Sequence, residues 1–189
     1  MIAQKWFAAL SLLAAAVLAG CAGSEPGRSI DDPTNSLVFG YVDMADAPTK
    51  VDVVRLRQVA PPPPDDKAFW RMGVRDGMFY NSYLPPGSYI LASLYGSSWW
   101  RGDYQYNFPR QQGGGDTAVR ADKPGIYFLG SFKYKSVKSG FLEAAKFDIE
   151  RVDTPTEREL LQRMLDTDSE LQKSTWGDRI RQRIARLKK

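Results

Sequence analysis

The chain has 189 residues, 43% of them hydrophobic, which suits one domain with appendages. The absence of histidine excludes a Ser-His-Asp triad and a histidine-based zinc site. The single cysteine excludes an internal disulfide, and the formal net charge of +4 reflects a basic run from Arg179 to Lys189, so nucleic-acid binding has little support.

The first part of the chain has the composition of an export signal. Lys5 supplies a positive charge, and an Ala- and Leu-rich apolar run extends from Trp6 to Val17. This run is shorter than the roughly 20 apolar residues that a lasting membrane-spanning helix needs. We therefore expect residues 1–20 to be a signal peptide that is absent from the mature protein.

A four-residue motif follows the apolar run. Leu18-Ala19-Gly20-Cys21 resembles the lipobox of bacterial lipoproteins at all four positions. The resemblance implies cleavage before Cys21, lipidation of its thiol and anchoring to a membrane by two or three acyl chains, since one chain alone binds reversibly. Ala22 in place of Asp favours the periplasmic face of the outer membrane over the inner membrane. The alternative is an ordinary signal peptide in which Cys21 is incidental.

The composition changes twice after the motif. Residues 21–35 are rich in Gly, Ser, Pro and Asp and have no periodic apolar pattern, which predicts a lipidated N-terminus on a flexible tether. Short β-rich runs separated by turn residues then occupy residues 36–153 without any helical period between them. This pattern predicts a mainly β domain, an antiparallel β-sandwich.

The expected strands share period-2 alternation or a short apolar run bounded by turn residues. They are Leu37–Val42, Val51–Leu56, Phe69–Met72, Met78–Ser82, Ser88–Leu94, Ile126–Lys135 and Ala145–Glu150. In the sixth of these, we expect Ile126, Phe128, Phe132 and Tyr134 to share one face. The run Pro61–Pro64 cannot donate ladder hydrogen bonds, so it predicts an exposed polyproline-like loop.

Two turns carry a family resemblance. Asp76-Gly77 predicts a hairpin turn, and Pro86-Gly87 predicts a type II turn with a positive φ at Gly87. The segments 76–79 and 84–91 resemble the "xDGxF" and "LPPGxYxL" signatures of transthyretin-like or carboxypeptidase-regulatory-like domains. The resemblance implies a transthyretin/Ig-like sandwich that serves as a binding or spacer module rather than a catalyst, and it names no site residues.

Residues 154–189 predict a C-terminal α-helical extension of two helices. Thr154, Pro155 and Glu157 have the spacing of an N-cap, a first-turn proline and a capping-box glutamate. We expect the second helix to start at Ser174 or Thr175.

The second helix carries a candidate binding surface. Trp176, Ile180 and Ile184 lie on one narrow apolar stripe, with Leu187 at its end and basic residues over most of the remaining surface. The stripe either docks on the sandwich or contacts a partner or anionic lipid, where each basic residue contributes ~1 kcal/mol near the surface.

A second candidate surface is aromatic. Trp99, Trp100 and Arg101 stand between turn residues, where exposed rings could stack on sugars or serve as interface hot spots. Tyr104, Tyr106 and Phe108 alternate nearby, and we favour the interpretation that these three line the core side of another strand.

Carboxylate chemistry is the one catalytic class that the composition leaves open. The acidic pairs lie beside proline or turn residues, where solvated acids are usual; they are Asp31-Asp32, Asp65-Asp66, and Asp43 with Asp46. We therefore expect no enzyme activity, no cofactor and no metal site.

These patterns together predict a non-catalytic envelope lipoprotein. Its sandwich domain would bind or position another protein of the envelope. The alternative is a module that binds peptidoglycan or another glycan through Trp99 and Trp100.

Overall fold

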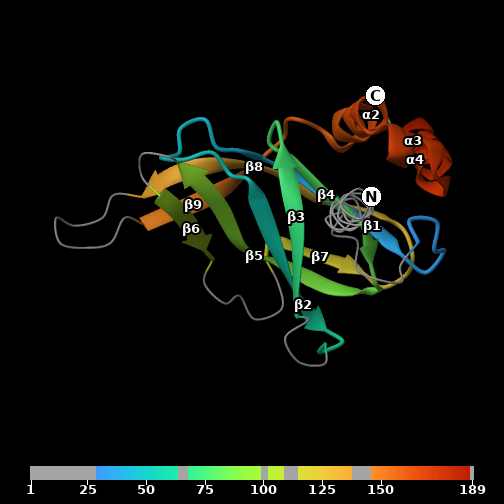
Figure 1. Cartoon of the computed structure of the whole chain (residues 1–189), viewed down its shortest axis with the longest axis horizontal. Coiled ribbons are helices and arrows are strands. Elements are labelled where there is room, and N and C mark those ends of the chain that lie inside the picture. Colours follow the sequence, from blue (N-terminus) through green and yellow to red (C-terminus); the bar gives the residue numbers. More distant parts are fainter. Residues whose placement is uncertain (1–28, 64–67, 99–101, 109–114, 138–145, 188–189) are drawn as a thin grey trace, which may run out of the picture.

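The computed structural model describes residues 29–63, 68–98, 102–108, 115–137 and 146–187 (Figure 1). Its strands are β1 (Ser36–Asp43), β2 (Val53–Ala60), β3 (Phe69–Arg75), β4 (Met78–Leu84), β5 (Gly87–Ser98), β6 (Gly102–Asn107), β7 (Ala118–Ala121), β8 (Ile126–Val137) and β9 (Lys146–Val152). Its helices are α2 (Glu157–Thr167), α3 (Ser169–Lys173) and α4 (Thr175–Arg186). The mainly β prediction and the C-terminal helical part are confirmed.

The strands form one curled sheet in the order β6-β5-β2-β3-β4-β1-β8-β9, and β7 pairs with β5 beside this path. The sheet is mixed because β1 and β8 run parallel, so the prediction of a purely antiparallel arrangement was wrong. A parallel pair needs a long crossover, and here the chain from β2 to β7 supplies it. The sequence carries no mark of this pairing, because β1 and β8 are far apart in the chain and several consecutive strands, such as β3 with β4 and β8 with β9, do form antiparallel hairpins.

Strand β3 joins the two halves of the sheet. Residues 69–73 pair with β2, whereas only Val74 and Arg75 pair with β4. The hairpin between β3 and β4 turns at Asp76 and Gly77, whose φ values of 49° and 76° confirm the predicted turn.

The turn before β5 differs from the prediction. Gly87 does not have the positive φ that a type II turn requires, because it already belongs to β5. The position suits glycine for another reason: a Cβ atom there would lie 2.8 Å from the carbonyl oxygen of Ala60. Tyr89 is buried and donates a hydrogen bond to the carbonyl of Pro85, which closes the turn onto the strand.

The inner face of the curled sheet encloses a first apolar core. Both halves of the sheet contribute to it, from Val38 and Phe79 in one half to Leu56 and Leu94 in the other. Tyr106 also belongs to this core and Tyr104 packs against it, which confirms the prediction for these two residues of β6. Phe108 lies one residue beyond the strand, and it lines a cavity as well as packing against the core.

A β-bulge in β8 overturns the expected single apolar face of that strand. The register against β1 shifts between Phe128 and Gly130, where Gly130 has a φ of 135°. Before the bulge, Ile126 and Phe128 point toward the helices; after it, Phe132 and Tyr134 point into the first core. The added residue inverts the side-chain alternation, because strand side chains change face at every position.

The helices cover the outer face of β1 and β8 and enclose a second apolar core (Figure 1). Leu37 and Phe39 of β1 contact it, together with Leu160, Leu161 and Met164 of α2. Tyr80 of β4 adds a polar tie, since its hydroxyl donates to the Asp168 carboxylate that caps α3.

The helix boundaries differ from the prediction at one end. The N-cap of α2 is Thr156, paired with Glu159 in a capping box, two residues beyond the expected cap at Thr154. Both frames place a threonine three residues before a glutamate, so the sequence spacing does not distinguish them. Helix α4 begins at Thr175, as expected, with Ser174 as its N-cap, whereas the short helix α3 between the two was not predicted.

Residues 29–35, which we expected to belong to the tether, make defined contacts with the folded part. The Asp31 carboxylate accepts a 2.8 Å hydrogen bond from the backbone N–H of Thr175 at the start of α4. Ile30 packs against the second core, and Asn35 is buried. In this structure, residues 29–35 therefore pack with the folded part.

Replacement of Gly130 by alanine should lower the free energy of unfolding by roughly 1–3 kcal/mol, because a side chain is strained at this positive φ. Gly73→Ala is the matched control, since a Cβ atom at Gly73 meets nothing within 4 Å. Urea denaturation of both variants checks the prediction, and equal stability of the two would contradict it.

Tyr80→Phe should lower the free energy of unfolding by about 1.5 kcal/mol at neutral pH through loss of the bond to Asp168. Burial, followed by the hydrogen bond to Asp168, raises the pKa of Tyr80 above its ordinary value of 10.0. The unfolded chain therefore loses this proton first as the pH rises above about 10, so stability should fall there. The fall should be smaller in Tyr80→Phe than in Tyr127→Phe, whose hydroxyl bond to Lys123 is exposed.

Candidate functional site

The proposed lipidation site and one candidate surface lie outside the described residues. These are Cys21 and the group Trp99, Trp100 and Arg101. The residues that flank this three-residue group in the sequence, Ser98 and Gly102, are direct partners across the β5–β6 pair.

The apolar stripe of the tail helix is occupied within the chain. Trp176 and Ile180 are both 0% exposed in the second core, and Ile184 is half-buried against it. The Arg179 guanidinium covers the Trp176 ring at 3.9 Å from the centroid. The stripe docks on the β domain, so in this structure these side chains are not presented to a partner.

The candidate acids that the structure describes serve local turns, a surface ion pair and, at Asp31, the bond to the start of α4. Asp43 accepts from the backbone N–H of Ala45, and Asp46 forms an exposed ion pair with Lys133. Asp65 and Asp66 lie outside the described residues. Within the described ranges, no group of three or more His, Cys, Asp or Glu side chains is placed to hold a metal ion.

No helix among the described residues combines the length and apolar character needed to cross a membrane. This finding does not bear on the N-terminal segment, which lies outside those residues.

A different surface gathers charged and aromatic side chains. We call it the arginine face: the side of β3, β2, β5 and β6 opposite the first core. Val54 and Leu56 of β2 point into that core, so Arg55 and Arg57 point outward. Strand pairing places Arg71 beside Arg55, and Phe69 beside Arg57.

Contacts on the arginine face hold Arg55 in place. Its guanidinium lies over the Phe69 ring, 4.2 Å from the centroid, and donates a hydrogen bond to the Tyr95 hydroxyl. Phe69 remains 42% exposed, the one large hydrophobic residue that is exposed to this degree in the described part of the chain. An aromatic ring under a guanidinium is a common arrangement at binding surfaces, since the cation is attracted to the ring and stays weakly hydrated.

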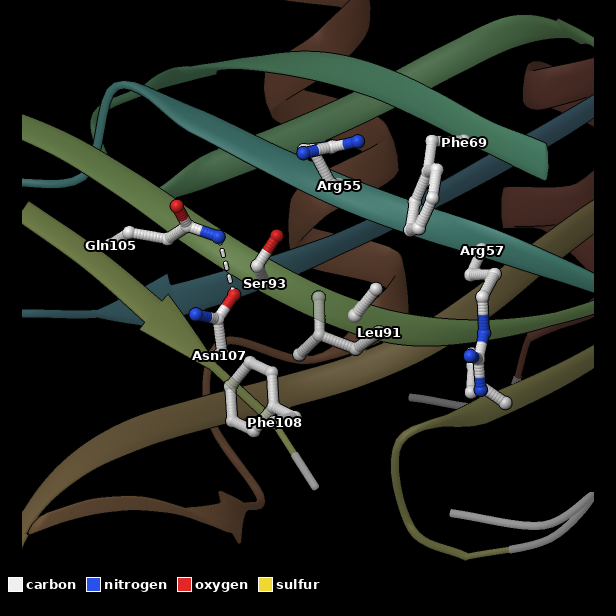
Figure 2. Close-up of a pocket in the computed structure, with 10 residues that line it drawn as sticks. Arg55, Arg57, Phe69, Leu91, Ser93, Gln105, Asn107 and Phe108 are labelled. Atoms are coloured by element: carbon white, nitrogen blue, oxygen red, sulfur yellow. Dashed lines mark hydrogen bonds between the residues drawn. The ribbon is translucent and has the colours of Figure 1, made fainter. Parts of the chain in front are cut away.

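A cavity of about 210 Å³ opens on the arginine face. Arg55, Arg57 and Phe69 line it from β2 and β3, and Gln105, Asn107 and Phe108 line it from β6 and the residue after it. Figure 2 shows these side chains arranged around Leu91 and Ser93 of β5. None of the described lining residues is acidic.

The two arginines of the cavity have unused hydrogen-bonding capacity. The Nε atoms of Arg55 and Arg57 are buried and have no hydrogen-bond acceptor among the described residues. Guanidinium groups are permanently charged donors with no acceptor capacity. The arrangement can bind an oxyanion, and its described lining residues include no nucleophile paired with a base.

The positive charge of the arginine face affects the pKa of a neighbouring tyrosine, Tyr95. Burial acts to raise the pKa of Tyr95, but hydrogen bonds with Ser93 and Arg55 and the charges of Arg55 and Arg71 outweigh it. The net effect lowers the pKa of Tyr95 below its ordinary value of 10.0. Positive potential on this face therefore stabilises a negatively charged oxygen.

Neither Arg55 nor Arg57 stands out in the sequence as a candidate binding residue. The alternation Val54-Arg55-Leu56-Arg57 indicates that both arginines share one side of a strand. Charged residues on the solvent side of a strand are ordinary, however, and only the pairing of β2 with β3 and β5 brings Phe69 and Ser93 beside them.

Comparison with protein-family models, curated proteins and solved structures finds no match to this chain. Its function must therefore be argued from the chemistry of its own residues.

Arg55→Gln should raise the pKa of Tyr95 toward 10.0, because the substitution removes both a hydrogen bond and the nearer positive charge. NMR titration of ring-labelled tyrosine checks this, with Arg181→Gln on α4 as the control that removes the same charge elsewhere. An unchanged Tyr95 pKa in Arg55→Gln would contradict the assigned field.

Proposed function

We propose that this protein is a non-catalytic lipoprotein of the bacterial envelope that is anchored through Cys21 and binds another envelope protein with its β domain. The uncovered arginine face is the observation that carries the binding part of the proposal. Exposed Phe69 beside arginines has the composition of an interface hot spot, since aromatic residues and arginine are enriched there. The lipobox residues support the anchor.

The short segment between Cys21 and the folded part supports a particular orientation of the protein on the membrane. Residues 22–28 are the only ones between Cys21 and Ser29, and such a segment spans roughly 25 Å when fully extended. The bond from Thr175 to Asp31 holds the chain beside the helices. We infer that the helical part faces the membrane, while β6 lies toward the other end of the molecule (Figure 1).

We also infer that the β domain is a variant of the transthyretin-like or carboxypeptidase-regulatory-like sandwich. Support comes from the two segments that carry the resemblance. The Asp76-Gly77 hairpin and the strand after Pro86 both build the first core, through Phe79 and Tyr89. Both halves of the curled sheet contribute to that core, as the two sheets of a sandwich do.

The glycan-binding alternative would use Trp99 and Trp100. One observation favours keeping it: the pairing of Ser98 with Gly102 puts both flanks of this segment at the end of the β5–β6 hairpin, next to the arginine face. Retention on purified sacculi that is lost in Trp99→Ala/Trp100→Ala would support this alternative.

Two experiments in living cells test the main proposal. Cys21→Ser should move the protein from the membrane fraction to the soluble fraction, because the anchor depends on the thiol. A photoreactive residue at position 69 should give one discrete protein adduct, identified by mass spectrometry, and the same residue at position 182 on the exposed side of α4 should not.

The adduct from position 69 should disappear when Arg71 and Arg57 are both changed to Gln. A different set of results would overturn the protein-partner proposal in favour of glycan binding. In that case Cys21→Ser releases the protein from the membrane, position 69 gives no adduct, and sacculi from the same cells retain the lipoprotein.

A further inference from the structure

We propose that the cavity between Arg55 and Arg57 is a binding site for an oxyanion group, a carboxylate or a phosphate, carried on an apolar or aromatic stem. The inference rests on the proposed binding function and names the chemistry that the arginine face recognises. The side chains that line this cavity are shown in Figure 2.

The charge balance of the cavity favours an anion. Two guanidinium groups line it, no described lining residue is acidic, and the Nε atom of each arginine is buried without an acceptor. The described part of the chain offers Arg57 no ion pair. A partly buried charge without a counterion is unfavourable, and a water molecule can accept its hydrogen bonds but cannot neutralise it.

Guanidinium geometry narrows the choice of anion. The planar fork of donors matches the two oxygens of a carboxylate or the face of a phosphate, and such paired hydrogen bonds are stronger than neutral ones. The Ser93 hydroxyl and the side-chain amides of Gln105 and Asn107 add neutral hydrogen-bonding groups in the same cavity. Arg55 is already oriented by Phe69 and Tyr95, so less freedom is lost when it binds.

The apolar lining indicates what the anionic group is attached to. Phe69 and Phe108 supply aromatic surface, and Ile90 and Leu91 supply aliphatic surface. The volume of about 210 Å³ is below the roughly 300–1,000 Å³ of complete small-molecule sites, so it suits a side chain or headgroup. A second cavity of about 220 Å³ shares Ile90 as a lining residue and is bordered by Ala118 and Val119 of β7.

The test uses the folded mature chain with Cys21→Ser and four probes: benzoate, phenyl phosphate, inorganic phosphate and the neutral analogue benzyl alcohol. NMR of the arginine Nε–H groups reports binding at Arg55 and Arg57. We expect benzoate or phenyl phosphate to shift both resonances saturably, inorganic phosphate to bind more weakly, and benzyl alcohol to leave them unchanged. The stronger of the two aromatic anions identifies the group as a carboxylate or a phosphate.

Arg57→Gln should weaken the aromatic anion about tenfold, since it removes one charged hydrogen-bond donor group. Arg71→Gln, which loses the same charge on the same face but outside the cavity, should weaken it less than about threefold. If Arg57→Gln does not fold, Arg57→Lys keeps the charge without the fork and should still weaken binding. Phe69→Ala should weaken benzoate more than inorganic phosphate.

Three outcomes overturn the inference: no saturable shift at Arg57, equal affinity in the Arg57 and Arg71 variants, or equal binding of benzyl alcohol. The first of these would mean that water alone occupies the cavity. Failure of this inference is distinguishable from failure of the proposed function. An adduct from position 69 without anion binding would support the protein-partner proposal and overturn the oxyanion site. Anion binding without an adduct would support the oxyanion site and overturn the protein-partner proposal.

Discussion

Strand β1 has apolar side chains on both of its faces, and most of the architecture follows from this constraint. Val38 and Val42 belong to the first core, whereas Leu37 and Phe39 belong to the second. All four are 2% exposed or less, so β1 needs cover on each face, and its backbone pairs with β4 on one edge and with β8 on the other. A near-continuous apolar run is typical of such a central strand. The curling of the sheet covers one face, and the three helices cover the other.

Strand β8 serves the same two cores in succession. Its bulge at Gly130 lets the part before it face the helices and the part after it face the interior of the curled sheet. Ser131, just after the bulge, is buried and donates to the carbonyl of Pro155, two residues before α2 begins. The same irregularity therefore divides the strand between the cores and positions the entry to the helical part. One residue of register shift has these consequences because side chains alternate with a period of two.

The helices pack on the outer face of β1, and this packing determines which surfaces remain exposed for the proposed binding. The apolar side of α4 packs against the second core, where Trp176 and Ile180 are fully buried, so this basic helix covers the core. The outer side of β3, β2, β5 and β6 has no comparable cover from the helices, whose main contacts are with β1, β8 and the neighbouring β4. Arg55 and Arg57 lie on that side, where their strand holds them at fixed spacing. The side chains available for the proposed binding therefore lie on the sheet and not on the apolar side of α4.

The sequence by itself determined the local features of this protein. The β3–β4 hairpin at Asp76-Gly77, the start of α4 at Thr175 and the inward-facing Tyr104 and Tyr106 of β6 follow from φ preferences, helix-start signals and period-2 alternation, all of which act over a few residues. Only the tertiary structure decided the parallel pairing of β1 with β8 and the bulge at Gly130. It also decided the cavity around Arg55 and Arg57, whose walls come from segments far apart in the chain. These features depend on which strands become neighbours, and that choice is set by the shared burial of apolar faces across the whole domain rather than by any local pattern.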